Sequence, residues 1–174
     1  MTMTESQNEN TIDYLLPENH DLLIETFRFG TMPVSKWRNR SAHLIVGTWY
    51  CFHFDFETAL FMLRDSIRAF NKRNGIENSD TSGYHETLTV FWVSLIFACI
   101  KNEFCPGSFQ EAAQLVLKKY SEDKTIFQDY YSFDVLSSKE ARTIWIPPDL
   151  VPDHRIDQQH SEELFNRLQL ILSK

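Results

Sequence analysis

Apolar side chains recur along this chain at intervals of three and four residues, the spacing that places them on one face of an α-helix. Polar stretches with Gly or Pro separate these periodic segments. We therefore predict an all-α fold, a single-domain bundle of five to six helices with a central group over residues 35–54, 56–74 and 83–104. The pattern predicts helices over residues 18–29, 35–54, 56–74, 83–104, 108–120 and 159–172, with short helical turns at 126–131 and 138–142.

The segment from Trp145 to Pro152 interrupts the helical pattern. Its prolines remove backbone donors and bias the residues before them toward extended angles. We predict that this Pro-rich segment is an ordered C-terminal strap that closes one end of the bundle. Residues 1–10 lack any periodicity and are predicted to be a disordered tail, so that residues 11–174 form a single helical domain.

Residues suited to helix ends support several of these boundaries. Gly30 can end the first helix, and Asp55 can cap the helix over 56–74. Ser108 and Glu111 have the spacing of a capping box.

The helix near residue 83 has two candidate caps, Ser82 and Gly83. If Gly83 is the N-cap, Glu86 falls at the third helical position, from which its carboxylate can reach back to the amide of the cap. This helix then continues as the most apolar stretch of the chain. Polar groups in its first turn are therefore expected at the edge of the core.

Composition narrows the possible functions. Seventeen basic and 24 acidic residues give a net charge of −7, and no cluster of Lys or Arg is expected to bind a phosphate backbone, so nucleic acid is not an expected partner. The apolar run from Val90 to Ile100 is about half the ~20 residues of a membrane span. The N-terminal residues lack the apolar core of a secretory signal, and the 3 cysteines lack CxxC spacing. We expect a cytoplasmic protein with no membrane partner, in which Cys51 and Cys99 are ordinary core residues.

Two histidines and a glutamate form the first candidate site. His43 lies in the middle of one predicted helix, and His85 and Glu86 lie at the start of another. Facing helices of a bundle can bring such side chains together, and two imidazoles with one carboxylate are suitable ligands for Zn or Fe. We treat His43, His85 and Glu86 as candidate metal ligands or catalytic groups, with the histidines as a general acid/base pair. No HExxH motif is present, and the alternative is that each group satisfies hydrogen bonds of the core or of the first helical turn.

Aromatic residues lie near both histidines and predict the walls of a ligand pocket. An apolar, aromatic wall with a few polar groups is typical of small-molecule sites. Gly47, one turn after His43, either leaves room in front of the imidazole or lets another helix approach closely. The predicted pocket residues are Trp49, Tyr50, Tyr84, Trp92 and Arg40.

A second candidate is an anion site at the start of the helix near residue 83. Amides that follow Ser82 and Gly83 would suit a carboxylate or phosphate group. In the alternative, Glu86 occupies this position and the arginines pair with surface acids. The arginines that could close over such a site are Arg38, Arg40, Arg68 and Arg142.

Several short motifs resemble those of a family of small, uncharacterised bacterial proteins. The similar words are W-x-x-R-x-A-H-L from Trp37 to Leu44, the stretch from Arg64 to Asn71, and G-Y-H-E-T from Gly83 to Thr87. The Ser138 to Arg142 turn and the Pro148 to Leu150 strap are also similar to this family, so that the resemblance covers about residues 33–152. It implies a self-contained, all-helical bacterial domain and implies no catalytic role for any residue.

These patterns together predict a small-molecule enzyme or binding protein with a His/Glu pocket between the helices over 35–54 and 83–104, and a metal ion bound in that pocket is one form of this hypothesis. The competing hypothesis is a non-enzymatic interaction module, in which the bundle docks a protein partner or forms a homodimer. The second hypothesis predicts an exposed face of Leu164, Phe165 and Leu168 on the terminal helix.

Overall fold

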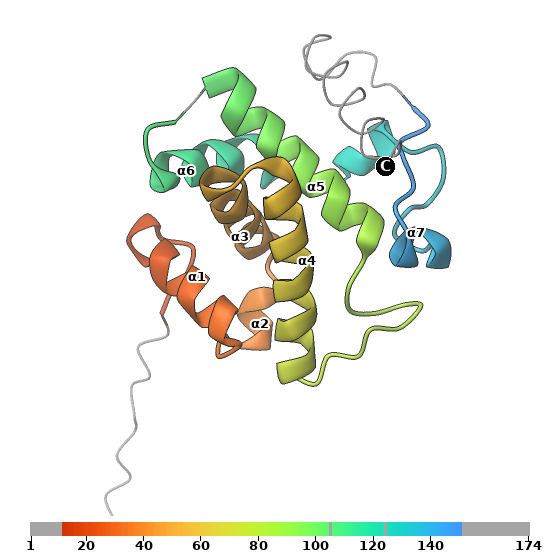
Figure 1. The fold of residues 1–174 in the computed structure, drawn as a ribbon, viewed down its shortest axis with the longest axis horizontal. Helices are drawn as coiled ribbons and strands as arrows, with labels where there is room; N and C mark the ends of the chain where they lie inside the picture. Colours follow the sequence, from red (N-terminus) through yellow and green to blue (C-terminus); the bar gives the residue numbers. More distant parts are fainter. Residues whose placement is uncertain (1–11, 105, 124, 151–174) are drawn as a thin grey trace, which may run out of the picture.

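The computed structural model describes residues 12–104, 106–123 and 125–150, and the described part of the chain is all helical, with no β-strand. This confirms the predicted fold class. Figure 1 shows the helices packed around a central group of α3, α4 and α5. The helices are α1 (His20–Phe29), α2 (Val34–Trp37), α3 (Arg40–His53), α4 (Phe56–Arg73), α5 (Glu86–Ala98), α6 (Phe109–Tyr120) and α7 (Lys139–Thr143), with 3-10 turns at Pro17–Asn19 and Ile126–Asp129 and a π-helical turn at Cys99–Phe104.

Helix α5 is the most buried of these elements. It packs against α3, α4 and α7 and continues directly into the π-helical turn. Because other elements cover it on several sides, its side chains are apolar around nearly the whole helix. Its fully buried side chains include Val90, Phe91, Val93 and Leu95. Within the described ranges no helix is both long enough and apolar enough to cross a bilayer.

The predicted helix over residues 35–54 is in fact two helices, α2 and α3. The side chain of Asn39 accepts a hydrogen bond from the amide of Ser41 at 2.8 Å and so begins α3. The break between α2 and α3 leaves Trp37 almost fully buried, where it stacks on Phe27 with ring centroids 4.5 Å apart. The sequence pattern missed the break because the apolar period continues across it.

Most predicted helix ends are confirmed. Gly30 ends α1 with a left-handed φ of 71°, and the Asp55 carboxylate caps α4 by accepting from the amide of Thr58 at 2.9 Å. Ser108 caps α6, but the carboxylate of Glu111 accepts from the amide of Gly107 rather than from that of Ser108.

The predicted N-cap of α5 was wrong. The cap is His85, whose Nδ1 accepts from the amide of Leu88 at 3.3 Å, so Glu86 is the first helical residue rather than the third. Gly83 instead has a φ of 78° in the preceding loop, where a Cβ would lie 2.4 Å from Oδ1 of Asn78. That oxygen accepts from the amide of Tyr84 at 2.8 Å and fixes the loop.

The strap after α7 is non-helical through Leu150, as predicted, and Thr87 of α5 anchors it. The Thr87 hydroxyl donates to the carbonyl of Ile144 at 2.7 Å and accepts from the amide of Ile146 at 2.9 Å. The hydroxyl of Tyr131 donates to the carbonyl of Ile146 at 3.0 Å. These three bonds join the strap to the core.

Three predictions fall outside the described residues. These are the disordered tail over residues 1–10, the terminal helix over 159–172, and the apolar face of Leu164, Phe165 and Leu168 on that helix.

The role of Thr87 can be tested with Thr87→Val, which keeps the shape of the side chain and removes both of its hydrogen bonds. We expect the free energy of unfolding to fall by about 1–3 kcal/mol, because the amide of Ile146 and the carbonyl of Ile144 lose their partners. Urea denaturation measures this. The matched control is Thr143→Val at an exposed position of α7, for which a loss as large as that of Thr87→Val would contradict the anchoring role.

Candidate functional site

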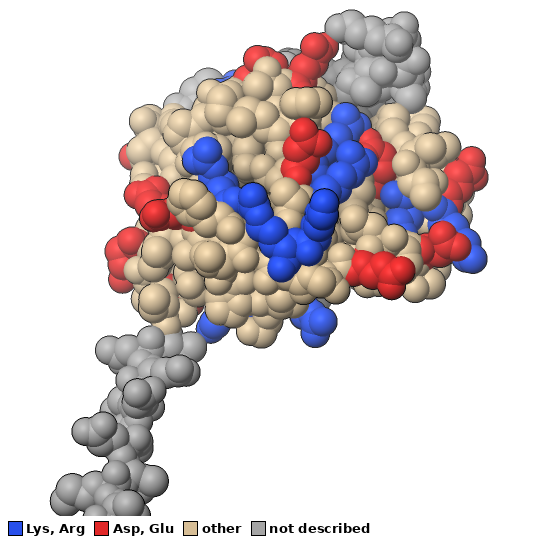
Figure 2. Space-filling view, turned by 60° about the horizontal axis from the view of Figure 1, so that its bottom comes forward, with Lys and Arg blue, Asp and Glu red and all other residues tan. Residues whose placement is uncertain are grey.

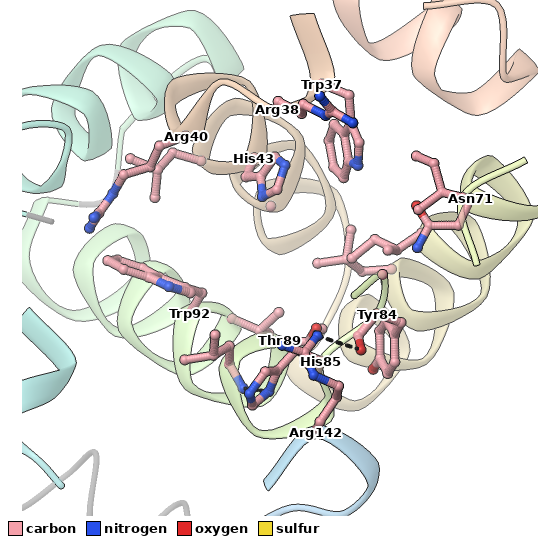
Figure 3. Close-up of a pocket in the computed structure, with 18 of the residues that line it drawn as sticks. Trp37, Arg38, Arg40, His43, Asn71, Tyr84, His85, Thr89, Trp92 and Arg142 are labelled. Atoms are coloured by element: carbon pink, nitrogen blue, oxygen red, sulfur yellow. Dashed lines mark hydrogen bonds between the residues drawn. The ribbon is translucent and has the colours of Figure 1, made fainter. Parts of the chain in front are cut away.

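A cavity of about 490 Å³ lies between α3, α4 and α5. Figure 3 shows labelled side chains from these helices, and from the segments before α3 and α5, turned toward a common space. Its lining residues are Arg40, His43, Leu44 and Gly47 of α3, Leu63, Ile67 and Asn71 of α4, Leu88, Thr89, Trp92, Val93 and Ile96 of α5, together with Trp37, Arg38, Ile76, Ser82, Gly83, Tyr84, His85 and Arg142.

Each of the three helices contributes one face to this cavity. On α3 the lining positions fall at i, i+3, i+4 and i+7 from Arg40, and on α4 they fall at i, i+4 and i+8 from Leu63. On α5 they follow the same period from Leu88 to Ile96. The cavity is therefore a product of regular helix geometry, with the capping residue His85 at its edge.

His43 is an exposed residue that lines the cavity, although many protein atoms surround its ring. Its ring stacks on that of Trp37, with centroids 4.0 Å apart. Burial is the main reason that the pKa of His43 is lowered to about 4, and the nearby charge of Arg40 lowers this pKa further. A hydrogen bond with the backbone of Trp37 acts in the opposite direction and raises it. His43 is therefore a neutral imidazole at pH 7.

His85 also lines the cavity, but both of its ring nitrogens are engaged by the backbone. Nδ1 accepts from the amide of Leu88, and Nε2 donates to the carbonyl of Val135 at 3.0 Å, which defines the neutral tautomer. Burial lowers the pKa of this imidazole. His85 thus joins the start of α5 to the segment before α7.

Glu86 points away from the cavity, toward α4. Its carboxylate forms an ion pair with Arg64, lies 3.7 Å from Arg68, and accepts a hydrogen bond from the hydroxyl of Tyr84 at 2.7 Å. Arg68 also lies over the ring of Tyr84, 4.4 Å from its centroid. Burial, and hydrogen bonding to Glu86, raise the pKa of Tyr84. The adjacent residues His85 and Glu86 point in different directions, as expected for a helical start.

The predicted set of His43, His85 and Glu86 does not converge on one point. His43 and His85 line the same cavity, but Glu86 is bound to the arginines of α4. Across residues 12–104, 106–123 and 125–150, no three His, Cys, Asp or Glu side chains are grouped so that they could hold a metal ion. The described residues therefore offer no three-ligand group for the predicted Zn or Fe ion.

The predicted pocket residues Arg40, Tyr84 and Trp92 line the cavity, whereas Trp49 and Tyr50 do not. Helices α3 and α5 approach so closely at Gly47 that a Cβ there would lie 2.9 Å from Cδ1 of Ile96. Beyond this point the space between the helices closes, and the hydroxyl of Tyr50 instead bonds the hydroxyl of Ser66 at 2.6 Å.

Trp49 faces α1, on another side of α3. The guanidinium of Arg28 lies 5.0 Å from the centroid of its ring, and Trp49 lines a separate surface hollow with residues of α1. The prediction grouped Trp49 with His43 because the two are neighbours in sequence. Helical geometry places them on different faces.

Sequence reasoning missed Trp37, whose ring supports His43, and the contribution of α4 to the cavity. The signal for α4 is the spacing of Leu63, Ile67 and Asn71, which repeats every four residues and ends on a buried polar side chain. The burial of this polar side chain is compensated by a hydrogen bond, because the amide of Asn71 donates to Oδ1 of Asn78 at 3.1 Å.

Comparisons of the chain with protein-family models, with curated proteins and with solved structures find no match.

The low pKa of His43 predicts how stability depends on pH. As pH falls from 6.5 toward 4, the unfolded chain gains a proton at this histidine before the folded protein does, so the free energy of unfolding should decrease over this range. Burial also lowers the pKa of His20 and of His85, so the wild-type slope is a sum. We expect His43→Asn to have a shallower slope in urea denaturation at a series of pH values. Equal slopes for the two proteins would contradict the assignment.

The ion pair of Glu86 predicts a large effect on stability. Glu86→Gln leaves Arg64 without its counter-charge, and we expect the free energy of unfolding to fall by about 2 kcal/mol. This loss of stability is smaller than that expected for a fully buried ion pair, because the Arg64 side chain is 28% exposed. The control is Asp80→Asn, which removes an exposed ion pair with Lys139 and should cost below about 1 kcal/mol. Equal losses in urea denaturation would show that the Glu86 pair is no stronger than a surface pair.

Proposed function

We propose that this chain binds a small organic molecule in the cavity between α3, α4 and α5. The observation that supports the proposal is the cavity itself, with a volume of about 490 Å³ and walls built mainly from aromatic and aliphatic side chains. Ligand sites of soluble proteins usually measure roughly 300–1,000 Å³ and have this composition.

The size of the cavity is unusual for a packing defect. Protein interiors are close-packed and contain few voids larger than a water molecule. Here Trp37, Trp92 and Tyr84, three large rings that could fill such a space, stand along its walls. Because these rings line the cavity without filling it, their arrangement supports the proposal that the cavity accommodates a ligand.

The polar groups of the cavity support binding of a mainly apolar molecule. Thr89 donates its hydroxyl to the carbonyl of His85 at 2.8 Å, and Asn71 is engaged by Asn78. His43 is neutral at pH 7 and its surface faces the cavity. In this proposal its imidazole forms a hydrogen bond with the ligand, and its low pKa makes it a weak base for any proton transfer.

The proposal can be tested with 2-naphthylmethanol, a neutral aromatic probe, by isothermal titration calorimetry. We expect one molecule to bind per chain, and Leu88→Trp to weaken this binding at least about tenfold, because the indole would occupy the cavity. The control is Phe61→Trp, which adds the same side chain at a position of α4 that is 64% exposed.

The control should bind the probe as the wild type does, and thermal melts should show that both variants fold. If the wild type binds no probe at millimolar concentration, or if Leu88→Trp and Phe61→Trp bind it equally well, the cavity is not the binding site and the proposal is wrong.

A further inference from the structure

We infer that the ligand of this cavity is an organic monoanion, with an apolar ring as its body and a single acid group bound by Arg40 at the Trp92 end. This inference rests on the proposed function and adds the chemical class of the ligand. The groups that carry it are the three arginines of the cavity and the contacts that each of them makes.

The charge of the cavity is opposite to that of the whole protein. The chain has a net charge of −7, yet the charged residues among the described lining are Arg38, Arg40 and Arg142, with no Asp or Glu. Figure 2 shows two converging rows of Lys and Arg side chains on one face of the molecule, with acidic side chains between and beside them, so that this outer surface carries both signs of charge, unlike the described lining of the cavity. The described lining therefore carries positive charge, which the nearby carboxylate of Asp123 offsets in part at Arg40, and a low-polarity wall strengthens the attraction of an anion.

Arg40 has hydrogen-bond donors that the described protein groups do not use. Its guanidinium stacks over the ring of Trp92, 4.6 Å from the centroid, as Figure 3 shows. Its Nε and Nη2 atoms are buried, and no acceptor among the described residues bonds them. Burial lowers the pKa of Arg40 and the charge of Asp123 opposes this, but an arginine remains charged at neutral pH. Leaving such donors without a partner is costly, and a planar carboxylate matches a guanidinium group in geometry. Because Nε and Nη2 are shielded from solvent in the structure, the proposed binding requires the Arg40 side chain to turn so that these donors face the ligand.

The other arginines near the cavity are already engaged or lie at its edge. Arg142 donates through Nη1 to the carbonyl of Tyr84 and through Nη2 to that of Leu136, both at 3.4 Å. Arg38 is exposed, and Arg64 pairs with Glu86. Among the described lining arginines, Arg142 leaves one buried donor, Nε, without an acceptor, whereas the half-buried Arg40 leaves two, so the structure supports one acid group at Arg40.

Arg40 and His43 define the orientation of the ligand. They are three residues apart on α3, so their side chains start on one face of the helix, with Cβ atoms roughly 5–6 Å apart. An acid group at Arg40 would place the body of the ligand toward His43 and the aliphatic side chains of α4 and α5. The neutral His43 offers no second charge. A ring-containing carboxylic acid fits this order of groups.

A matched pair of probes tests the inference: 2-naphthoate and 2-naphthylmethanol, which share a ring and differ in charge. By calorimetry at pH 7.5 we expect the wild type to bind the naphthoate at least about tenfold more tightly, as expected for a charged hydrogen-bonded pair in a partly desolvated site. In Arg40→Gln the ratio of the two affinities should fall to about one. The ratio is independent of a general loss of affinity, because both probes are measured on each protein.

Two further variants assign the effect to Arg40. Arg38→Gln removes an exposed arginine of the same lining and should keep most of the preference. Arg40→Lys keeps the charge without the planar fork, and we expect an intermediate ratio. It also serves if Arg40→Gln does not fold in thermal melts.

Equal affinities for the two probes in the wild type would overturn the inference while leaving the proposed function intact. A preference that survives in Arg40→Gln but is lost in Arg38→Gln would overturn the role of Arg40. If neither probe binds, the proposed function fails, and the inference fails with it.

Discussion

The carboxylate of Glu86 lies buried between α4 and α5, with Arg64, Arg68 and the hydroxyl of Tyr84 around it. A buried carboxylate is tolerated only when charge and hydrogen bonds compensate it, so this group fixes where the start of α5 meets α4. The residues on either side extend the same constraint. His85 bonds the carbonyl of Val135, and Thr87 bonds the strap at Ile144 and Ile146. The position of α5, and with it one wall of the cavity, depends on these contacts.

The cavity has the shape that follows from helices that are close at one end and apart at the other. At Gly47 the absence of a side chain lets α3 approach Ile96 of α5. Elsewhere the walls are formed by the ring of Trp37, which packs on His43 of α3 and Phe70 of α4, and by the ring of Trp92 of α5, under the guanidinium of Arg40. Most of the walls of this space are helical, and the loop residues Ile76, Ser82 and Gly83 complete the lining. Helical walls help to pre-organise a binding site.

The periodicity of the apolar residues was enough to predict the helices and the class of the fold, because burial of one face per helix dominates the pattern. The apolar periodicity did not predict which residue caps a helix or where a helix breaks. Asn39 breaks a helix whose apolar period continues, and His85 takes the capping position expected of Ser82 or Gly83, because the backbone of Gly83 is required in the loop. For the candidate site, the sequence indicated His43 and His85 but grouped them with Glu86 and Trp49, which face other helices. This grouping treated residues that are neighbours in sequence as neighbours in space. The end of the cavity at Gly47 could not be predicted either, because the close approach of α3 and α5 there depends on tertiary packing that no local pattern specifies.

The three consecutive residues His85, Glu86 and Thr87 contact three different parts of the chain: the segment before α7, helix α4 and the strap. Successive helical positions differ by about 100° in direction, so a single turn serves as a junction between elements that are distant in sequence. The loop before this turn and the first turn itself should therefore tolerate changes in length very differently. An inserted residue at the exposed tip of the preceding loop, over residues 79–81, leaves the junction in register, whereas one inserted between His85 and Thr87 rotates part of the junction by a helical step and separates its partners. Among related sequences, variation in length is expected in that loop and not in the turn that follows it.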